Sequence, residues 1–238
     1  MRTLPKIEYK TLTVLMPVFN EQATVKEIVA RCLLVDLPLT IDLVIVDDGS
    51  SDETAKVLAT IDDPNVRVLT HMANQGKGAA LRTGLAAATG DLVIVQDADL
   101  EYNPEDWRVL LDPVLKGTAF VVYGNRFAGG GRNMSGLHRF GNRFLSLVTS
   151  VLYAKRLSDM ETCYKLFDRR VFKPITVVSD RFDFEPEITA KVLRQGYDIV
   201  EVPISYAGRE FHEGKKITWR DGFGALRALV RFRFSKSL

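Results

Sequence analysis

Apolar and polar positions along the first hundred residues predict strands and helices in alternation. Short apolar runs rich in β-branched residues are typical of buried strands, and they occur at 11–19, 41–46, 66–69 and 92–96. The segments between them have helical spacing or a helix-forming composition and cover 21–34, 52–60 (with Ser51 as a candidate N-cap) and 79–88. Strands that alternate with helices across short connections build a parallel sheet covered by helices. We therefore expect an α/β fold with a mainly parallel central sheet.

The second half continues this pattern after a glycine-rich interruption. A fifth strand is predicted at 119–123, and three consecutive glycines follow within the segment 128–136. Both a plain flexible connection and a loop that closes over bound substrate fit that composition. Apolar residues between 137 and 154 share one helical face and indicate a core helix. A last strand region is predicted at 200–206.

The C-terminal segment carries apolar and basic residues on separate stripes of one predicted helix. Such a helix either packs its apolar stripe on the rest of the chain or lies on an anionic membrane surface. We therefore divide the chain into an N-terminal extension (1–10), one domain (11–216) and a C-terminal basic amphipathic helix (217–238).

Polar residues follow each of the first four predicted strands, at 19–21, 47–49, 71–78 and 97–101. In an open α/β sheet, ligands bind beyond the carboxyl ends of the parallel strands. All four ends open on the same edge of the predicted sheet. This coincidence indicates a binding site at that edge rather than four unrelated turns.

The fourth strand end carries three acidic residues, Asp97, Asp99 and Glu101. Carboxylates supply the hard oxygen ligands that Mg²⁺ and Mn²⁺ prefer, and such an ion can be shared with a diphosphate. A solvated turn is the alternative, because Asp is common in turns. The other strand ends that converge on this edge favour the metal–diphosphate site.

Charge is unevenly distributed along the chain, although its net value is only +2. Residues 1–110 contain 10 Lys and Arg against 17 Asp and Glu, whereas the remainder contains 22 against 13. An acidic half suited to a cation is therefore followed by a basic half suited to phosphates or anionic lipid.

Composition and motifs argue against several classes of protein. We expect a soluble or peripheral protein, because no apolar run of about 18 residues and no signal-peptide core occurs. The two cysteines have no metal-binding spacing and fit a reduced, cytoplasmic setting. A dinucleotide fingerprint and a P-loop are absent, which argues against NAD enzymes and P-loop ATPases. No basic recognition helix or aromatic RNA-binding motif occurs, so nucleic acid is not an expected partner.

A set of short motifs in fixed order resembles the family 2 glycosyltransferases. The motifs are MPVFNE, VDDGSSD, NQGKGAALRTG, QDADLE, YGNRF, FGNRF, DMETCYKLF, FEPEI, EVPISY and GREFHEGKK, and the resemblance covers roughly residues 11 to 222. Within that family the chain looks most like the polyprenyl-phosphate sugar synthases, such as dolichyl-phosphate mannose or glucose synthase. The resemblance implies a single-domain, Rossmann-like nucleotide-diphospho-sugar transferase fold. It also implies a hexosyltransferase that is peripheral on the cytoplasmic face of a membrane, with the helix at 137–154 lying at the membrane surface rather than in the core.

The resemblance further implies which residues bind a nucleotide-diphosphate sugar of the GDP-mannose or UDP-glucose type. Phe19 would contact the base, Asp48 would form hydrogen bonds to the nucleoside, and Asp97 would orient the ribose or the sugar. Asp99 and Glu101 would hold Mg²⁺ or Mn²⁺. The full implied donor set is Pro17, Phe19, Glu21, Val46, Asp48, Asn74, Gly76, Lys77, Asp97, Ala98, Asp99, Arg209 and Lys215.

The basic half would bind the lipid acceptor and the leaving diphosphate. By the same resemblance, Arg126 and Arg139 would bind the phosphate of a polyprenyl (dolichyl) phosphate with the assistance of Asn142, since Arg offers always-charged, fork-shaped donors. Arg209 and Lys215 would neutralise the departing diphosphate. A solvated basic turn is the alternative for these last two residues.

Two positions leave the interpretation open. Lys77 is either a donor contact or a surface charge. Glu101 stands where many relatives have Gln, so the identity of the bound ion stays open.

The reaction implied is transfer of one hexose with inversion at the anomeric carbon, and the catalytic residues implied are Asp97, Asp99, Arg126, Arg209 and Lys215. A phosphate acceptor is already anionic near neutral pH and needs no general base. A transferase that acts on a sugar hydroxyl is the first alternative; it needs a base, for which Asp159 and Glu161 are the candidates. A non-catalytic nucleotide-sugar binding module is the second alternative, and the complete acidic set argues against it.

Overall fold

The computed structural model describes residues 7–130, 136–209 and 219–235, apart from the side chains of residues 137, 138 and 219–221. These residues form a seven-stranded sheet with the order β3-β2-β1-β4-β6-β5-β7. Every pairing is parallel except those that β6 makes with β4 and β5, so the predicted α/β fold with a mainly parallel sheet is confirmed. The strands are β1 (Thr11–Val18), β2 (Thr40–Asp47), β3 (Val66–Thr70), β4 (Leu92–Val95), β5 (Val121–Asn125), β6 (Lys165–Asp168) and β7 (Val200–Pro203).

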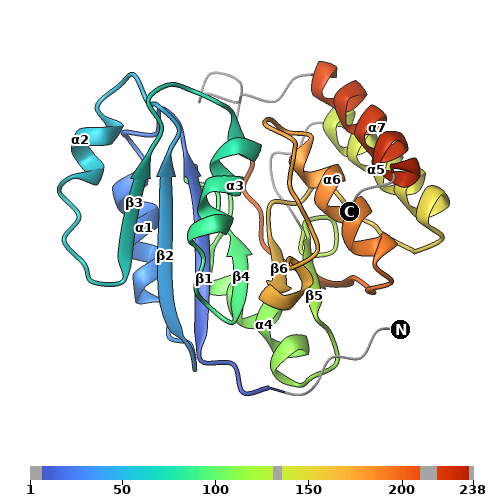
Figure 1. Ribbon diagram of the computed structural model, residues 1–238, viewed down its shortest axis with the longest axis horizontal. Helices are drawn as coiled ribbons and strands as arrows, with labels where there is room; N and C mark the ends of the chain where they lie inside the picture. The colour runs from blue at the N-terminus through green and yellow to red at the C-terminus, as the bar shows by residue number, and fades with distance from the viewer. Residues whose placement is uncertain (1–6, 131–135, 210–218, 236–238) are drawn as a thin grey trace.

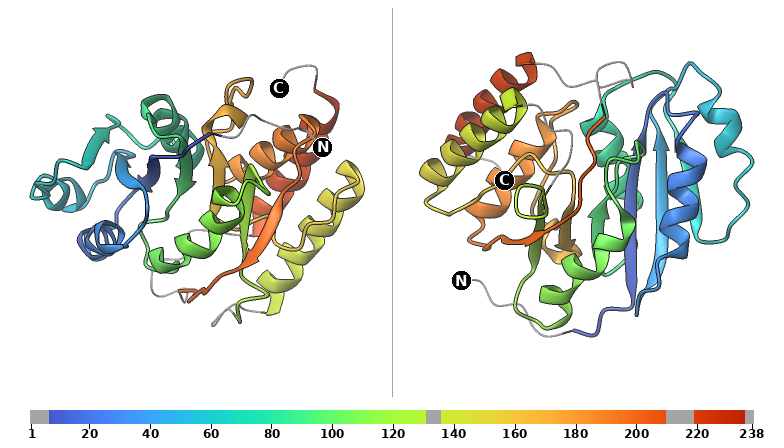
Figure 2. Two further views of the ribbon diagram at one scale, coloured as in Figure 1. Left: turned by 90° about the horizontal axis from the view of Figure 1, so that it is seen from below. Right: turned by 180° about the vertical axis from the view of Figure 1, so that it is seen from behind.

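Helices cover both faces of the sheet. α3 and α6 lie over one face, α1 and α4 lie over the other, and α5 and α7 pack side by side beyond α6 (Figures 1 and 2). The helices are α1 (Val25–Leu34), α2 (Thr54–Leu58), α3 (Lys77–Ala87), α4 (Trp107–Leu115), α5 (Gly136–Tyr153), α6 (Phe184–Arg194) and α7 (Trp219–Phe234), with short 3₁₀ turns at Pro104–Asp106 and Arg169–Val171.

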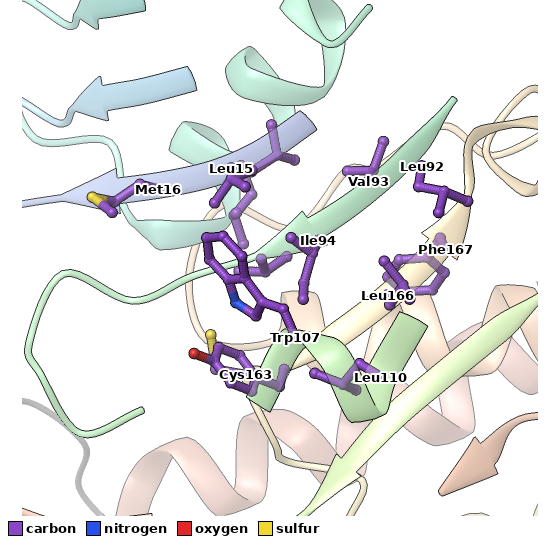
Figure 3. Close-up of a cluster of buried hydrophobic side chains, with 14 of the residues drawn as sticks. Leu15, Met16, Leu92, Val93, Ile94, Trp107, Leu110, Cys163, Leu166 and Phe167 are labelled. Atoms are coloured by element: carbon purple, nitrogen blue, oxygen red, sulfur yellow. The ribbon is translucent and has the colours of Figure 1, made fainter. Parts of the chain in front are cut away.

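The core lies around the two central strands, β1 and β4. Both strands are nearly continuous apolar runs, because helices cover them on both sides. All four residues of β4 are buried, and Trp107 of α4, at 0% exposure, packs beside Ile94 of β4 (Figure 3). Phe167 of β6 lies on the other side of this cluster. This packing fixes β4 and therefore the acidic residues that follow it.

The strand order creates a crevice beside β1. The chain passes from β1 outward to β2 and β3 and then crosses to β4 on the opposite side of β1. The first three strands end level with one another, since Val18 pairs with Asp47 and Asp47 pairs with Thr70. An open α/β sheet binds ligands at such a switch point. The predicted convergence of strand ends on one edge is thus confirmed, and that edge is uppermost in Figure 1.

Two local predictions need correction. Ser51 does not cap the second helix: Asp52 Oδ1 accepts the Thr54 N–H at 3.0 Å instead, and Ser51 N donates to Asn20 Oδ1 at 2.8 Å. Asn20 can reach that position because its φ of 54° turns the chain sharply after β1. The fifth strand also begins two residues later than predicted, at Val121.

The interpretation of residues 137–154 as a core helix is wrong for part of its apolar face. Phe140, Phe144 and Val151 of α5 are 70%, 47% and 74% exposed. The helix buries Leu145 at 7% exposure together with two hydroxyl side chains, Ser146 and Thr149, at 2% and 0%. These small side chains satisfy their hydroxyls within the fold, since the Thr149 hydroxyl donates to a backbone carbonyl one turn earlier and the Ser146 hydroxyl accepts a backbone N–H. Hydrophobic periodicity in the sequence reflects apolar residues only, so it does not show that small hydroxyl side chains are buried on this helix.

Helix α7 divides its apolar residues between two faces. Ala225, Leu229 and Phe232 are buried at 0–3% exposure, whereas Phe223 and Phe234 are 67% and 75% exposed. The helix therefore packs on the domain and also presents apolar side chains outward. In the parts of the chain that the structure describes, no helix is both long and apolar enough to cross a bilayer.

Some predictions fall on residues outside the described ones. These are Lys215, residues 131–135 of the predicted 128–136 segment, residues 1–6 of the extension 1–10, and the boundary between 11–216 and 217–238.

Candidate active site

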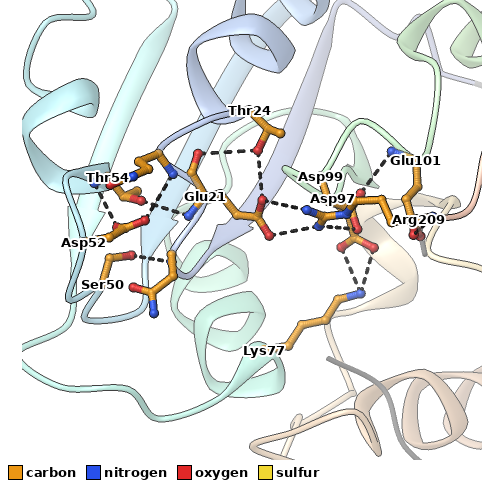
Figure 4. A network of polar contacts seen from close by, with 12 residues as sticks. Glu21, Thr24, Ser50, Asp52, Thr54, Lys77, Asp97, Asp99, Glu101 and Arg209 are labelled. Carbon is orange, nitrogen blue, oxygen red and sulfur yellow. Dashed lines mark hydrogen bonds and ion pairs between the residues drawn. The ribbon is translucent and has the colours of Figure 1, made fainter. Parts of the chain in front are cut away.

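Acidic side chains that follow β1 and β4 meet at the crevice between these two strands, and a further acidic residue follows β2. Glu21 follows β1, Asp48 follows β2, and Asp97 and Asp99 follow β4. Figure 4 shows Glu21, Asp97 and Asp99 gathered around the side chain of Arg209, with Lys77 approaching Asp97 from α3. The structure thus brings together five of the predicted donor-binding residues.

Asp48 anchors the segment that leads into α3. Its Oδ1 accepts the Gln75 N–H (3.0 Å) and lies 2.6 Å from His71 Nδ1, and its Oδ2 accepts the Asn74 Nδ2–H (2.8 Å) and the Gly76 N–H (2.7 Å). Asp48 itself is 2% exposed. The nucleoside contact predicted for Asp48 is therefore joined by a role that the sequence did not indicate, which is to hold residues 74–76 in place.

Gly76 is required where this segment passes the chain before α6. Its φ is 104°, and a Cβ atom there would lie 2.3 Å from the Asp180 carbonyl oxygen. Only glycine fits such a conformation and such a close approach. The backbone conformation and the close approach to Asp180 therefore explain why this segment of the predicted donor site has glycine at position 76.

Lys77 is not a surface charge. Its Nζ lies 2.9 Å from Asp97 Oδ1 and 3.0 Å from Glu185 Oε1, and its side chain is 15% exposed. Burial acts to lower the pKa of Lys77, but the carboxylates of Asp97 and Glu185 outweigh it and raise that pKa well above its usual value. A permanent ammonium group therefore holds Asp97 at the crevice.

Arg209 joins the two sides of the crevice. Its guanidinium pairs with Glu21 (Nη2–Oε1 3.0 Å) and with Asp99 (Nη2–Oδ2 3.1 Å). Its backbone N–H donates to Glu101 Oε1 at 2.6 Å, and Glu101 Oε2 accepts the Tyr206 hydroxyl at 2.7 Å. The segment after β7 is thereby held against the acidic strand end, and the role of Arg209 toward a diphosphate stays a prediction.

The acidic strand end suits a divalent cation in charge and donor type. Burial, together with the charges of Asp97 and Glu101, raises the pKa of Asp99 to about 7, while Arg209 acts to lower it. Such an excess of negative charge on hard oxygen atoms fits Mg²⁺ or Mn²⁺. Across the described residues, however, no three His, Cys, Asp or Glu side chains converge as a ready ligand set. The metal site at Asp99 and Glu101 stays a prediction.

Arg126 forms a buried pair that the sequence did not reveal. Its Nε and Nη2 donate to the two oxygens of Asp159 at 2.9 and 2.7 Å, and the exposures are 7% for Arg126 and 0% for Asp159. The guanidinium also lies 5.3 Å from the centre of the Tyr206 ring. The other two predicted acceptor residues, Arg139 and Asn142, lie on the first turns of α5, where Arg139 is exposed.

A cavity of about 490 Å³ opens beside α5. Its lining includes Asn125 at the end of β5, Phe127 just after it, Arg143 and Leu147 of α5, and Arg156. The Arg143 guanidinium lies 5.5 Å from the centre of the Phe127 ring. The cavity therefore combines two cationic side chains with apolar walls next to the exposed stripe of α5.

Three buried polar atoms near Lys77 have no hydrogen-bond partner among the described residues: Glu161 Oε1, Thr162 Oγ1 and Glu185 Oε2. They lie beside Lys165, which is 0% exposed and donates to the carbonyls of Met160 (2.9 Å) and Thr162. Sequence reasoning gave no binding role to these residues, although the motifs DMETCYKLF and FEPEI contain them.

The crevice, the acidic strand end and the strand order define a nucleotide-diphospho-sugar transferase fold. Residues 13–176 match glycosyl transferase family 2. The chain belongs to this family, which confirms the resemblance on which the predicted site residues depend.

Relatives within the family transfer sugars to a lipid phosphate. The chain is 29% identical over 210 residues to the undecaprenyl-phosphate 4-deoxy-4-formamido-L-arabinose transferase of Pseudomonas fluorescens (strain Pf0-1), which covers 86% of this chain and 59% of that protein. It is 27% identical over 220 residues to the transferase of the same name from Proteus mirabilis (strain HI4320), which covers 90% of this chain and 65% of that protein. The chain thus spans about three fifths to two thirds of these relatives.

Solved structures with the same fold include glucosyl-3-phosphoglycerate synthase from Mycobacterium tuberculosis. Its complex with UDP has a TM-score of 0.74 at 18% identity and covers 94% of this chain and 80% of that one. Its complex with Mn²⁺ and UDP-glucose has a TM-score of 0.70 at 21% identity and covers 94% and 79%. At this identity the likeness establishes the fold.

Proposed function

We propose that the protein transfers a hexose from a nucleotide-diphosphate sugar to a polyprenyl phosphate and inverts the anomeric carbon, with a divalent metal as cofactor. The observation that carries this proposal is the alternation of charge at the β1–β4 crevice, where Lys77, Asp97, Asp99 and Arg209 meet. Cationic groups suit a diphosphate, and acidic groups suit a metal and sugar hydroxyls. The named activity of the lipid-phosphate relatives supports the acceptor class, and the UDP and Mn²⁺ of the solved neighbours support the donor class.

The leaving diphosphate would be stabilised by charge from two sources. Asp99 and Glu101 would hold Mg²⁺ or Mn²⁺, which supplies positive charge to the diphosphate oxygens. Arg209 would contact the same diphosphate by exchanging its pairs with Glu21 and Asp99 for phosphate oxygens. Groups preorganised toward developing charge supply the largest part of many rate enhancements.

The acceptor phosphate would attack the anomeric carbon as the bond to the diphosphate breaks. A phosphate oxygen is already anionic, so this step needs no general base. Arg126, Arg139 and Asn142 are proposed to hold the acceptor phosphate. Because Asp159 already takes Nε and Nη2 of Arg126, Arg126 would offer Nη1 to the acceptor.

The cavity beside α5 supports an acceptor that carries both charge and an apolar chain. Arg143 and Arg156 line it, and Leu147, 61% exposed, continues from its wall onto the outer stripe of α5. Phe144 and Val151 extend this stripe. An apolar stripe next to a cationic cavity suits a lipid phosphate at a membrane surface.

The membrane proposal predicts a specific loss of vesicle binding. In sedimentation with vesicles of mixed anionic and neutral phospholipid, Phe144→Asp should reduce the bound fraction at least about fivefold, because it places a charge in the apolar stripe. Leu34→Asp is the matched control, since Leu34 of α1 is 80% exposed and lies away from α5. Equal binding by the two variants would count against contact through α5.

A transfer assay separates the candidate functions. Radiolabelled UDP-glucose or GDP-mannose is offered with Mn²⁺ to detergent-solubilised polyprenyl phosphate and, in parallel, to a panel of soluble sugars. Label in the lipid fraction supports the proposal. Label in the soluble sugars alone indicates the hydroxyl-acceptor alternative, which Glu161 favours because burial and Glu185 raise its pKa to about 7, near the value that a general base needs. Donor binding without turnover indicates a binding module.

A further inference from the structure

One arc of polar side chains runs from the acidic strand end to the start of α6. Lys77 Nζ contacts both Asp97 Oδ1 and Glu185 Oε1, at 2.9 and 3.0 Å, so the two carboxylates face each other across one ammonium group. Glu185 is 5% exposed and lies in the first turn of α6. Glu161, which belongs to the segment between α5 and β6, lies near enough for Glu185 to perturb its ionisation.

A second arc returns from this segment to the strand end. Asp159 holds Arg126, whose guanidinium lies 5.3 Å from the Tyr206 ring centre. The Tyr206 hydroxyl donates to Glu101, which also accepts the backbone N–H of Arg209. The two arcs together connect Arg209 and Asp99 at one end with Glu161 and Glu185 at the other.

Three unpartnered polar atoms belong to Glu161, to its chain neighbour Thr162 and to Glu185 at this end of the arcs. Glu161 Oε1, Thr162 Oγ1 and Glu185 Oε2 are buried and have no partner in the described part of the chain. Buried polar atoms in folded proteins are normally paired, so several unpaired atoms in one place indicate a polar ligand that completes them. The ion pair with Lys77 satisfies only the other oxygen of Glu185.

The chemistry of this end suits hydroxyl groups. A sugar hydroxyl both donates and accepts hydrogen bonds, as the Thr162 hydroxyl does, and carboxylates accept from two hydroxyls at once. Burial and the charge of Glu185 raise the pKa of Glu161 to about 7. Near neutral pH the Glu161 and Glu185 carboxyl groups can therefore donate a hydrogen bond as well as accept hydrogen bonds. The diphosphate would lie at the opposite end, beside Arg209.

We propose that Glu161, Thr162 and Glu185 bind hydroxyl groups of the transferred sugar and determine which sugar the protein accepts. This inference rests on the proposed function, because it places the sugar of the same nucleotide-diphosphate donor. It assigns the nucleoside diphosphate to the crevice and the sugar to the space between α6 and the segment before β6.

Calorimetric titration tests the assignment. UDP and UDP-glucose, and GDP and GDP-mannose, are titrated with Mn²⁺ into the wild type and into the variants Glu161→Gln, Glu185→Gln and Thr162→Val. The measured quantity is the ratio of the nucleoside diphosphate Kd to the nucleotide-sugar Kd. For the donor that the wild type binds, both Gln variants should lower this ratio about tenfold or more, and Thr162→Val should lower it less, since a site built to bind hydroxyls loses much affinity when a partner is removed. The Kd of the nucleoside diphosphate should stay within about twofold.

Glu187→Gln is the matched control. Glu187 lies on the same helix, is 0% exposed, and has its oxygens paired with Lys191 and with the N–H groups of Val178 and Ser179. This variant should lower the thermal midpoint and leave the Kd ratio unchanged. Glu161→Gln should not lower the midpoint, because it removes a carboxylate whose charged form is disfavoured by burial and which forms no ion pair with the residues that the structure describes. A merely structural role for Glu161 predicts the reverse pattern.

The outcomes separate the two proposals. Unchanged ratios in both Glu161→Gln and Thr162→Val, with donor binding intact, overturn the sugar assignment and leave the proposed function standing. These two variants carry the test even if Glu185→Gln fails to fold through its effect on Lys77. A wild type that binds none of the four ligands overturns the proposed function itself, and the assignment with it.

Discussion

Replacement of Asp48 by Asn should detach the segment that leads into α3. The change keeps the shape of the side chain but converts one acceptor oxygen into an NH₂ group. Each carboxylate oxygen has two donors in the structure. In either orientation of the Asn amide, two of these donors therefore face its NH₂ group, which cannot accept their hydrogen bonds.

The magnitude follows from the number of donors left without an acceptor. An unsatisfied buried donor costs about 1–3 kcal/mol, so two donors at a residue that is 2% exposed should lower the free energy of unfolding by about 4 kcal/mol. With a urea m-value of about 2–3 kcal/mol/M, the unfolding midpoint should fall by roughly 1.5–2 M. Because residues 74–76 lead directly to Lys77, nucleotide-sugar affinity should fall as well.

Urea titration followed by circular dichroism measures this effect. Asp62→Asn is the control, because Asp62 lies in an exposed loop before β3, and its midpoint should move by no more than about 0.5 kcal/mol in equivalent free energy. A midpoint for Asp48→Asn no lower than that of Asp62→Asn would refute the role of Asp48 as the anchor of this segment.

Further variants test the other buried charges. Arg126→Met should lower the free energy of unfolding by about 3–5 kcal/mol because it leaves the buried Asp159 carboxylate unpaired, and Asp159→Leu in the same chain should restore at least half of that loss in urea titration; no recovery would contradict the pairing. Between pH 5 and pH 8 the wild type should lose about 2–3 kcal/mol more stability than Glu161→Gln. The reason is that burial raises the folded-state pKa of Glu161 from 4.5 to about 7, so in this window the folded chain holds more protons than the unfolded chain and stability falls as pH rises; parallel pH profiles would exclude this origin. Asp99→Ala should abolish metal-dependent turnover and weaken Mn²⁺ binding, measured by electron paramagnetic resonance, by about tenfold or more; retained Mn²⁺ affinity would remove Asp99 from the ligands.

The sheet and its ligand-binding edge could be predicted because both depend on local patterns. Continuous apolar runs such as those of β1, β2 and β4 are typical of strands that are buried on both faces of a parallel sheet. The ends of parallel strands share one edge of the sheet because the strands run in the same direction. The antiparallel direction of β6 could not be predicted in this way, since strand direction is set by how the chain returns to the sheet and leaves no periodic signal.

The partners of the site residues could not be predicted, because they come from distant parts of the chain. Lys77 meets Glu185, and Arg209 meets Glu21, across 108 and 188 positions of sequence. Residue type showed that Lys77 and Arg209 could bind phosphate. Only the packing of α3 against the start of α6, and of the segment after β7 against β1, shows what holds them in place before a ligand arrives.

The reversed direction of β6 limits how sugar selectivity could change in this protein. Because β6 runs against its neighbours, the residues before it, including Glu161 and Thr162, reach the edge that the other strands reach with the residues after them. The register that pairs Phe167 with both Val93 and Val121 fixes where this segment joins β6, because a shift of one residue would turn every β6 side chain to the opposite face. Lys165 and Phe167 are both fully buried, so such a shift would disrupt the core. If Glu161 and Thr162 bind the sugar as proposed, selectivity should be altered by substitutions that keep this register, and a library built on this chain should vary side chains at fixed length.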